Sequence, residues 1–520
     1  MKFTIALFAG LVLVVLATPA HGALTRGPYI QIGTPTTMTI VWRTDSPIRG
    51  KVHYGVSAKV LTKTASGLDG QTQHEVLVTG LTPATRYYYG VEDTDGTILS
   101  GDSYFFETAP EVGSKTASRM WIVGDSGTGD NNQAMVRDSM LEWTESHRPD
   151  IYLHMGDMAY NSGKDDEFQE NFFDVYDTIL RNTVCWATMG NHEGYTASSA
   201  NQSGPYYDAY VLPTAGQAGG LASGTEAYYS FDYANIHFVV LDSDQSDRSP
   251  NGAMLTWMTS DLAATTQDWI IAYWHHPPYS KGSHDSDTES KLIDMRENAL
   301  PILEAAGVDL VLAGHSHIYE RSYLVNGAYD TPTTAAGHIL NPGTGNPTGD
   351  GPYTKATGGN QGSVYVVAGH GGRGMYQKGT HPLMAVTERK FGSCIVDVEG
   401  NTLTLHNVRA DGVISDTMGL IKGNGFLLTS PNGGESYMAN ETVTITWASV
   451  GVGDTVTVQL STDNGKNWAT IASDIPNNGS FEWTVPSTVT NHGRIRIENS
   501  AGTVGDNSNS SFSLNIPKPY

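Results

Sequence analysis

The chain has few cysteines, few basic residues and few long apolar runs, and each shortage excludes a class of protein. Only two of its 520 residues are cysteine, which excludes a small scaffold held together by several disulfides. The 30 Lys and Arg residues are outnumbered by 54 Asp and Glu residues, and the net charge of −24 argues against binding nucleic acid through bulk electrostatics. After the N-terminus, no apolar segment reaches the roughly 18 residues that a membrane-spanning helix needs.

Glycine, in contrast, is abundant. The 58 glycines occur with many short runs of Val, Ile, Thr and Tyr, a composition typical of strands and loops rather than long helices. The apolar fraction of 39% is sufficient for packed cores. At this length we expect two to four domains.

The N-terminus has the pattern of an export signal. Lys2 precedes the apolar stretch "FTIALFAGLVLVVLA", and Ala20 and Gly22 occupy the small-residue positions that cleavage requires. We therefore predict a signal peptide over residues 1–22 and a secreted or periplasmic protein, with a retained membrane anchor as the alternative. The two cysteines, Cys185 and Cys394, each lie in an apolar strand-like run, and the sequence leaves open whether they pair.

Three segments follow the signal, and together they predict a multidomain fold. Residues 23–110 alternate as strands do and predict a β-sandwich with Trp42 and Tyr88 in its core. Residues 117–421 alternate apolar strands with helix-like stretches, which predicts a layered α/β domain with its site at the strand ends. Residues 425–517 return to short strands and predict a second, Ig-like β-sandwich. Its three tryptophans are expected in the core, with carbohydrate contact as the alternative: Trp447, Trp468 and Trp483.

The central segment contains the residues that suggest chemistry. In "LVLAGHSHIYER" an apolar run ends in Gly314 and is followed by two histidines, and residues two apart in an extended chain point to the same side. His315 and His317 would thus face one spot, as metal ligands do. Four other apolar strands end in similar blocks: "VGDSG" (Asp125), "GDMAY" (Asp157, Tyr160), "MGNHEG" (Asn191, His192) and "WHHPPY" (His275, His276). Each block alone is also compatible with an ordinary turn, but five in one domain are not explained by chance.

The donors in these blocks are oxygens and nitrogens with no thiolate. Such a set suits iron, zinc or manganese, and it is large enough for two ions sharing one carboxylate. The five blocks in this order resemble the calcineurin-like metallophosphoesterases. The tyrosine three residues after Asp157 narrows the likeness to purple acid phosphatases, and the likeness includes a fibronectin type III-like N-terminal domain. It covers about residues 25–420 and implies a central β-sandwich flanked by helices.

The resemblance implies a role for each residue. Asp125, Tyr160 and His317 would bind the first metal and Asn191, His275 and His315 the second, with Asp157 bridging them. The tyrosine ligand implies Fe(III) in the first position and a divalent ion (Zn, Fe or Mn) in the second. His192 would orient or protonate substrate, with His284 as a further substrate-facing histidine. His276 would lie outside the metal ligands and near the substrate. His370 stands where plant-like members carry an acid, and its role is left open.

These roles imply an exported phosphatase that hydrolyses phosphate monoesters by attack of a metal-activated hydroxide on phosphorus. The residual positive charge of such a site would attract a small phosphorylated substrate despite the acidic chain. Two alternatives remain: a phosphodiesterase or nucleotide hydrolase on the same metal core, and a binding or adhesion protein that has lost activity. All seven ligand positions are filled, which argues against the second alternative.

Overall fold

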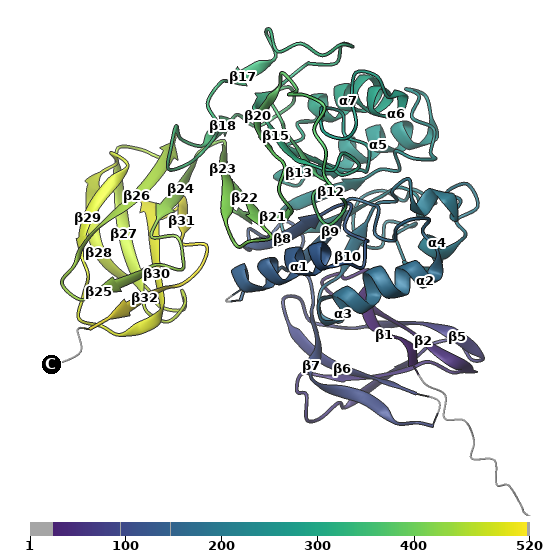
Figure 1. Ribbon diagram of the computed structural model, residues 1–520. Coiled ribbons are helices and arrows are strands. Elements are labelled where there is room, and N and C mark those ends of the chain that lie inside the picture. Colours follow the sequence, from purple (N-terminus) through teal and green to yellow (C-terminus); the bar gives the residue numbers. More distant parts are fainter. Residues whose placement is uncertain (1–23, 94, 146, 517–520) are drawn as a thin grey trace, which may run out of the picture.

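The computed structural model describes residues 24–93, 95–145 and 147–516, so the predicted signal peptide lies outside the described residues. The described chain forms an N-terminal β-sandwich, a central layered α/β unit and a C-terminal β-sandwich (Figure 1). This arrangement confirms the predicted fold class. Neither sandwich contributes to the strand ends described below, so the site is built by the central unit alone.

The N-terminal sandwich packs a three-stranded sheet against a four-stranded one. Their orders are β1-β2-β5 and β4-β3-β6-β7. Trp42 is fully buried, as predicted. Tyr88 is not a core residue: side chains alternate along β6, and Tyr87 and Tyr89 point inward instead. The strands are β1 Leu24–Gln31, β2 Thr37–Ile48, β3 Lys51–Gly55, β4 Lys63–Ser66, β5 Gln71–Thr79, β6 Arg86–Glu92 and β7 Ile98–Glu107.

The central unit contains two seven-stranded sheets. The first has the order β10-β9-β8-β21-β22-β23-β18 and the second β11-β12-β13-β14-β19-β15-β20. The first sheet comprises β8 Ser118–Val123, β9 Ile151–His154, β10 Cys185–Ala187, β18 Tyr353–Lys355, β21 Gly392–Glu399, β22 Thr402–Arg409 and β23 Ile414–Lys422. The second comprises β11 Tyr229–Tyr233, β12 Ile236–Val240, β13 Trp269–Tyr273, β14 Leu310–Ala313, β15 Tyr319–Ser322, β19 Val364–Ala368 and β20 Met384–Glu388. A small hairpin joins β16 Leu324–Val325 to β17 Ile339–Asn341.

Short helices connect the strands. The longest, α1 Asn131–Trp143, begins after Asp130, whose carboxylate accepts the backbone N–H groups of Asn132 and Gln133. The predicted helical stretch from Ser290 is continuous through α6, η3 and α7. Helix α5 is nearly as long as α1, and α2, η1 and α3 follow one another without a break. The helical segments are α1, α2 Asp165–Phe168, η1 Gln169–Phe173, α3 Asp174–Leu180, η2 Glu193–Tyr195, α4 Pro205–Ala209, α5 Ala253–Ala264, α6 Ser290–Asp294, η3 Met295–Ala299 and α7 Leu300–Ala306.

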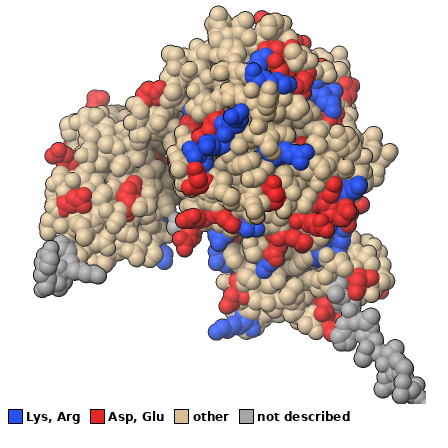
Figure 2. All heavy atoms as spheres, viewed as in Figure 1, with Lys and Arg blue, Asp and Glu red and all other residues tan. Residues whose placement is uncertain are grey.

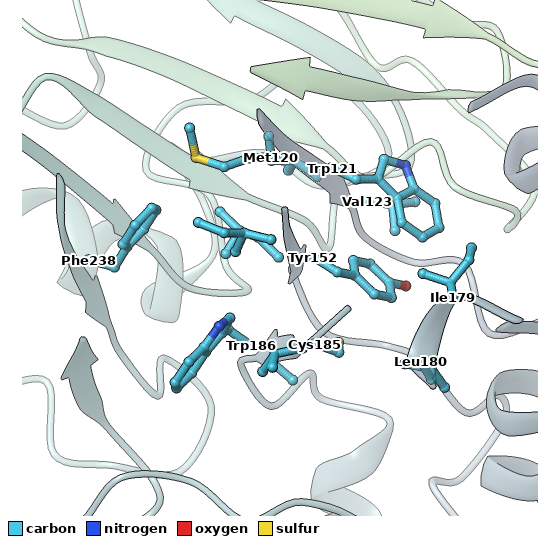
Figure 3. Close-up of a cluster of buried hydrophobic side chains, with 14 of the residues drawn as sticks. Met120, Trp121, Val123, Tyr152, Ile179, Leu180, Cys185, Trp186 and Phe238 are labelled. Carbon is cyan, nitrogen blue, oxygen red and sulfur yellow. The ribbon is translucent and has the colours of Figure 1, made fainter. Parts of the chain in front are cut away.

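The two central sheets face each other across a continuous apolar core. Trp186 of the first sheet stacks at 4.0 Å on Phe231 of the second, and Phe231 stacks on Phe238. Trp186 and Phe238 are labelled in Figure 3. Aromatic side chains of this size bury large apolar areas and stabilise the face-to-face packing. On its other face, the first sheet is covered by helices, and there Trp121 and Tyr152 stack at 4.2 Å between ring centroids and both contact Tyr176 of α3. The rigid core thus holds the ends of both sheets in a defined relation.

Both cysteines are free, buried thiols of the first sheet. Cys185 is on β10 and Cys394 is on β21, which are separated in the sheet by β9 and β8. Three strand spacings amount to about 14 Å. A disulfide requires Cα atoms closer than about 7 Å. The pairing that the sequence left open is therefore excluded by the strand order.

One buried ion-pair network lies in the second sheet, away from the strand ends. His237 of β12 contacts Asp232 through Nδ1 at 2.7 Å and Asp261 of α5 through Nε2 at 2.9 Å. Burial opposes a charge on the imidazole, but the two carboxylates prevail and raise the pKa of His237 to about 9. This network ties α5 to its sheet in a pH-dependent way.

The C-terminal sandwich pairs the sheet β24-β26-β29 with a second sheet that contains β25, β27, β28, β30, β31 and β32. Trp447 and Trp483 are buried in its core as predicted, whereas Trp468 is only half-buried. The strands are β24 Gly425–Ser430, β25 Ser436–Met438, β26 Thr442–Val450, β27 Thr455–Ser461, β28 Ala469–Pro476, β29 Ser480–Thr484, β30 Thr490–Asn499, β31 Gly505–Asn507 and β32 Phe512–Asn515.

The surface agrees with the acidic composition. On the face shown in Figure 2, Lys and Arg side chains are interspersed with Asp and Glu rather than gathered into one basic patch. That distribution gives no electrostatic footprint for a polyanion on this face. Among the described residues, no helix combines the length and apolarity needed to cross a bilayer.

Candidate metal centre

The predicted site residues lie where parallel strands of both sheets end. β8, β9 and β10 run parallel in the first sheet, and β13 and β14 run parallel in the second. The carboxyl ends of parallel strands meet at one edge of a sheet, and here the two edges adjoin. Five of the predicted residues follow these five strands in turn: Asp125, Asp157, Asn191, His275 and His315.

The backbone is strained at three of these positions. Asp125, Asp157 and His315 have φ values of 56°, 56° and 63°, in the left-handed region that non-glycine residues rarely adopt. Each follows a glycine. A Cβ on Gly314 would lie 2.6 Å from Oδ2 of Asp125, so only glycine permits the strand ends to approach this closely. Strain of this kind, which costs on the order of 1–3 kcal/mol per residue, is typical of functional sites.

Four of the predicted donors form one group. The Tyr160 hydroxyl lies 3.2 Å from Oδ1 of Asp125 and 3.0 Å from Oδ2 of Asp157. It also lies 3.4 Å from Nε2 of His317, which is itself 3.5 Å from Oδ1 of Asp125. This is the first-metal set that the sequence predicted, and the structure brings all of its members together.

A second group adjoins the first. Oδ1 of Asn191 lies 3.0 Å from Nε2 of His275 and 2.9 Å from Nδ1 of His315, and the two imidazole nitrogens are 3.2 Å apart. Nε2 of His275 is also 3.5 Å from Oδ2 of Asp157. A single carboxylate oxygen therefore lies beside both groups.

The spacing of these donors fits metal coordination. With bonds of about 2.0–2.1 Å to a cation, neighbouring ligands lie about 3.0 Å apart in an octahedron and about 3.4 Å apart in a tetrahedron. The donor separations of both groups lie close to these edges. Carboxylate, phenol, amide and imidazole donors without a thiolate suit iron, zinc or manganese. The residues thus fit a pair of cations.

Hydrogen bonds orient two of the imidazoles. Nδ1 of His275 donates to the Met155 carbonyl at 2.7 Å, and Nδ1 of His317 donates to the Gly374 carbonyl at 3.2 Å. A carbonyl only accepts, so Nδ1 carries the hydrogen in each ring, and Nε2 is the nitrogen that faces the donor groups and would bind a cation once unprotonated. Backbone acceptors of this kind commonly fix the tautomer of a metal-binding histidine.

The buried acidic groups of the first donor group would be stabilised in their ionised forms by a cation. Burial raises the pKa of Tyr160 well above that of a free phenol, and the carboxylates of Asp157 and Asp125 raise it further. A tyrosinate at this position therefore requires a cation beside it. Burial likewise opposes ionisation of Asp157, but the charge and hydrogen bond of His275 outweigh it and lower the pKa of Asp157.

The three histidines predicted to face substrate differ in exposure. The His192 ring contacts the Tyr160 ring at 4.5 Å between centroids, and its Nδ1 donates to the Asn161 carbonyl at 2.6 Å. His284 is half-buried, stacks on His315 at 3.7 Å and bonds Glu289 through Nδ1 at 2.7 Å. His276 is only 2% exposed, and its Nδ1 lies 2.8 Å from the Ser243 hydroxyl. All three lie near the donor groups.

Glu193 is a central residue that the sequence analysis overlooked. Its side chain is fully buried and accepts four backbone N–H groups. Oε2 accepts from Asp157 at 2.8 Å and Gly190 at 2.9 Å, and Oε1 accepts from Met158 at 2.9 Å and Ala159 at 3.1 Å. The carboxylate thus ties the loop after β9 to the loop after β10. Its place directly after His192, in "GNHEG", was the available signal.

Two further residues of interest, His370 and Arg373, lie in the loop after β19. His370, whose role was left open, is fully buried and bonds Asn407 through Nε2 at 2.9 Å, which fits a role inside the protein rather than at the rim of the site. Arg373 was overlooked. Its guanidinium carbon lies 4.7 Å from the centroid of the Tyr160 ring. No carboxylate of the described residues forms an ion pair with it.

Family comparisons agree with this geometry. Residues 118–319 match the calcineurin-like phosphoesterase family, and residues 26–108 match the N-terminal domain of purple acid phosphatases. The chain is a purple acid phosphatase-like metallophosphoesterase. Residues 430–516 match a Kre9/KNH-like N-terminal Ig-like domain, which agrees with the predicted C-terminal fold.

Curated relatives of this metallophosphoesterase come from plants and animals. Purple acid phosphatase 23 of Arabidopsis thaliana is 29% identical over 350 residues, covering 56% of this chain and 73% of its own length. Acid phosphatase type 7 of Mus musculus is 26% identical over 340 residues, covering 58% of this chain and 73% of its own. These relatives support an acid phosphatase-type phosphoesterase with a binuclear metal centre.

Two solved structures share the fold. Purple acid phosphatase PPD1 from yellow lupin seeds superposes with a TM-score of 0.58 at 18% identity, covering 76% of this chain and 74% of that one. The structure of PhoD superposes with a TM-score of 0.51 at 12% identity, covering 95% and 94%. At such identities the likeness concerns the fold alone.

Proposed function

We propose that this metallophosphoesterase is an exported phosphatase that hydrolyses phosphate monoesters. The observation that carries the proposal is Oδ2 of Asp157, which lies 3.0 Å from the Tyr160 hydroxyl and 3.5 Å from Nε2 of His275. One carboxylate oxygen between a phenol-containing and an imidazole-containing donor group is suited to bridge two cations. The proposed export rests on the signal-like N-terminus.

We assign the ligands as the sequence predicted. The first cation, proposed as Fe(III), would be held by Asp125, Tyr160 and His317, and the second, proposed as a divalent Zn, Fe or Mn ion, by Asn191, His275 and His315. Asp157 would serve both. When bound, the two cations activate a water molecule as nucleophile and neutralise phosphoryl charge. Asp125 and Asp157 are almost fully buried, which keeps competing solvent from these donors.

The chain's own residues then handle the substrate. Nδ1 of His192 is occupied by the Asn161 carbonyl, so Nε2 is the nitrogen available to protonate the departing alcohol. Arg373 places a guanidinium over Tyr160 without a carboxylate partner among the described residues, and it would pair with a phosphoryl oxygen. His284 is held by Glu289 beside His315, where it would donate to the same substrate.

The experiment compares monoester and diester hydrolysis on purified protein with measured metal content. Two metals per chain and a preference for monoesters would support the proposal. Preferred diester turnover would replace it with a phosphodiesterase, and bound metal without hydrolysis of either ester would favour a binding protein.

His192→Ala separates protonation from phosphate binding. An alkoxide is a poor leaving group and needs an acid, whereas nitrophenolate needs little help. The variant should keep both metals and lose kcat/KM on the order of 10²-fold or more for an alkyl phosphate, and clearly less for nitrophenyl phosphate. Equal losses for the two esters would remove the acid role from His192.

We place the three domains at residues 23–110, 117–421 and 425–517, and we propose a separate role for the C-terminal one. In the C-terminal domain, half-buried Trp468 and Phe481 line an open groove of about 730 Å³ together with Asp463 and Asn467. Aromatic faces beside polar side chains suit contact with a carbohydrate surface. Retention of the full chain on insoluble cellulose, lost in Trp468→Ala, would support this contact, and equal retention of the variant would contradict it.

A further inference from the structure

A cavity of about 500 Å³ opens beside the second donor group. Asn191 and His315 of that group form part of its wall. Its other walls include Tyr195, His284 and Lys291. The volume lies within the range of small-molecule sites. A phosphoryl group fills only a fraction of it, so the remainder is available to whatever is esterified to the phosphate.

Tyr195 is the unusual residue of this wall. Its ring is 69% exposed, although large aromatic side chains usually find an apolar partner. It lies 5.5 Å from the His192 ring in an edge-on arrangement. His192 in turn contacts Tyr160 of the first donor group. His192 therefore contacts Tyr195 as well as Tyr160, and His192 is the residue that we propose protonates the leaving group.

The backbone under Tyr195 is firmly held. Nε2 of Gln245 donates to the carbonyls of Gly194 and Ala197, both at 3.0 Å, and so clamps the turn on either side of the tyrosine. A Cβ on Gly194 would lie 2.4 Å from Oδ2 of Asp244, so glycine lets the turn approach the loop that contains Asp244 and Gln245 without displacing the Asp244 side chain. An exposed ring on an anchored turn is a pre-organised stacking surface.

We propose that Tyr195 and this cavity form the leaving-group subsite, and that it selects phosphate monoesters of planar aromatic or heteroaromatic alcohols. The inference rests on the proposed phosphatase function and adds its substrate class. A leaving oxygen close enough to be protonated by His192 directs its substituent toward Tyr195. A planar ring bonded to that oxygen would stack on the exposed phenol, whereas a small alkyl group leaves the surface uncovered.

The test measures binding, so it does not depend on turnover. Benzylphosphonate and ethylphosphonate are non-hydrolysable and differ only in the planar ring. Calorimetric titration of the purified full chain with its native metals should show tighter binding of benzylphosphonate. Tyr195→Ala should weaken benzylphosphonate about 2- to 12-fold and ethylphosphonate less than about 2-fold. Tyr195→Phe, which keeps the ring, should retain the preference.

A matched control is Tyr376→Ala. Tyr376 is another exposed tyrosine, 57% accessible, and it does not line this cavity. The Tyr376→Ala variant should leave the affinities for both phosphonates unchanged. If Tyr195→Ala weakens the binding of both phosphonates equally, or leaves the preference for benzylphosphonate intact, the proposed leaving-group subsite is wrong. The proposed phosphatase function is not affected by that result. If the unaltered protein binds neither phosphonate and hydrolyses no monoester, the proposed function itself falls.

Discussion

Glu193→Gln should dismantle the metal centre without touching a proposed ligand. Each oxygen of the carboxylate accepts two backbone N–H groups. The donors lie in the loops after β9 and β10, which contain Asp157 and Asn191. Glutamine keeps one acceptor oxygen, and its amide nitrogen would face two N–H donors. Two buried donors would then lack a partner.

The magnitude follows from those two donors. Each buried N–H left without an acceptor costs about 1–3 kcal/mol, which sums to about 2–6 kcal/mol for the pair. Because about 1.4 kcal/mol is a factor of ten, the loops should open at least about 30-fold more often. Burial and the neighbouring Asp157 charge raise the pKa of Glu193 to about 8, so the comparison belongs above pH 8, where Glu193 is ionised and both of its oxygens accept.

Hydrogen exchange and metal analysis test this expectation. The amides of Met158 and Ala159 should exchange at least about 30-fold faster in Glu193→Gln, and bound metal should fall. Glu226→Gln is the control, because Glu226 is half-buried and accepts a single backbone N–H, from Leu212 at 3.0 Å. A Glu193→Gln protein with two metals, unaltered exchange and full activity would refute the proposal that Glu193 holds the two loops together.

The remaining predictions address the ligands and the pH response. Tyr160→Phe should abolish the broad visible charge-transfer band of iron-loaded protein; a band that is unchanged would sink the iron–tyrosinate assignment. His275→Ala should lose the second metal, whereas His276→Ala should keep it, and metal analysis giving the opposite order would reverse their roles. Protonated His237 stabilises the fold fully below pH 6.5, and this contribution of about 3 kcal/mol is lost as the pH rises through about 9. Urea midpoints at pH 6 and pH 9.5 should therefore differ less in His237→Gln; an equal difference would exclude His237 as the cause.

Local sequence patterns were sufficient to predict the main elements and the chemical character of the site. Apolar runs that end in "GD", "GNH" or "GHSH" predicted strands that deliver donors at one edge, and β8, β9, β13 and β14 end two or three residues before those donors. This worked because strand periodicity and ligand chemistry are local properties. Which side chains of a strand face the core was harder to predict, because a shift of one residue exchanges the two faces of a strand. Tyr88, predicted in the core, is an example.

Which residues meet could not be predicted from local patterns and is known from the three-dimensional fold. The separation of Cys185 from Cys394 depends on strand order, and sequence distance does not contain strand order. The four hydrogen bonds of Glu193 join loops from two different strands, and the exposure of Tyr195 depends on a loop some 50 residues further along the chain. Such contacts arise when distant segments pack, and packing fixes distances, burial and backbone strain that no single stretch of sequence encodes.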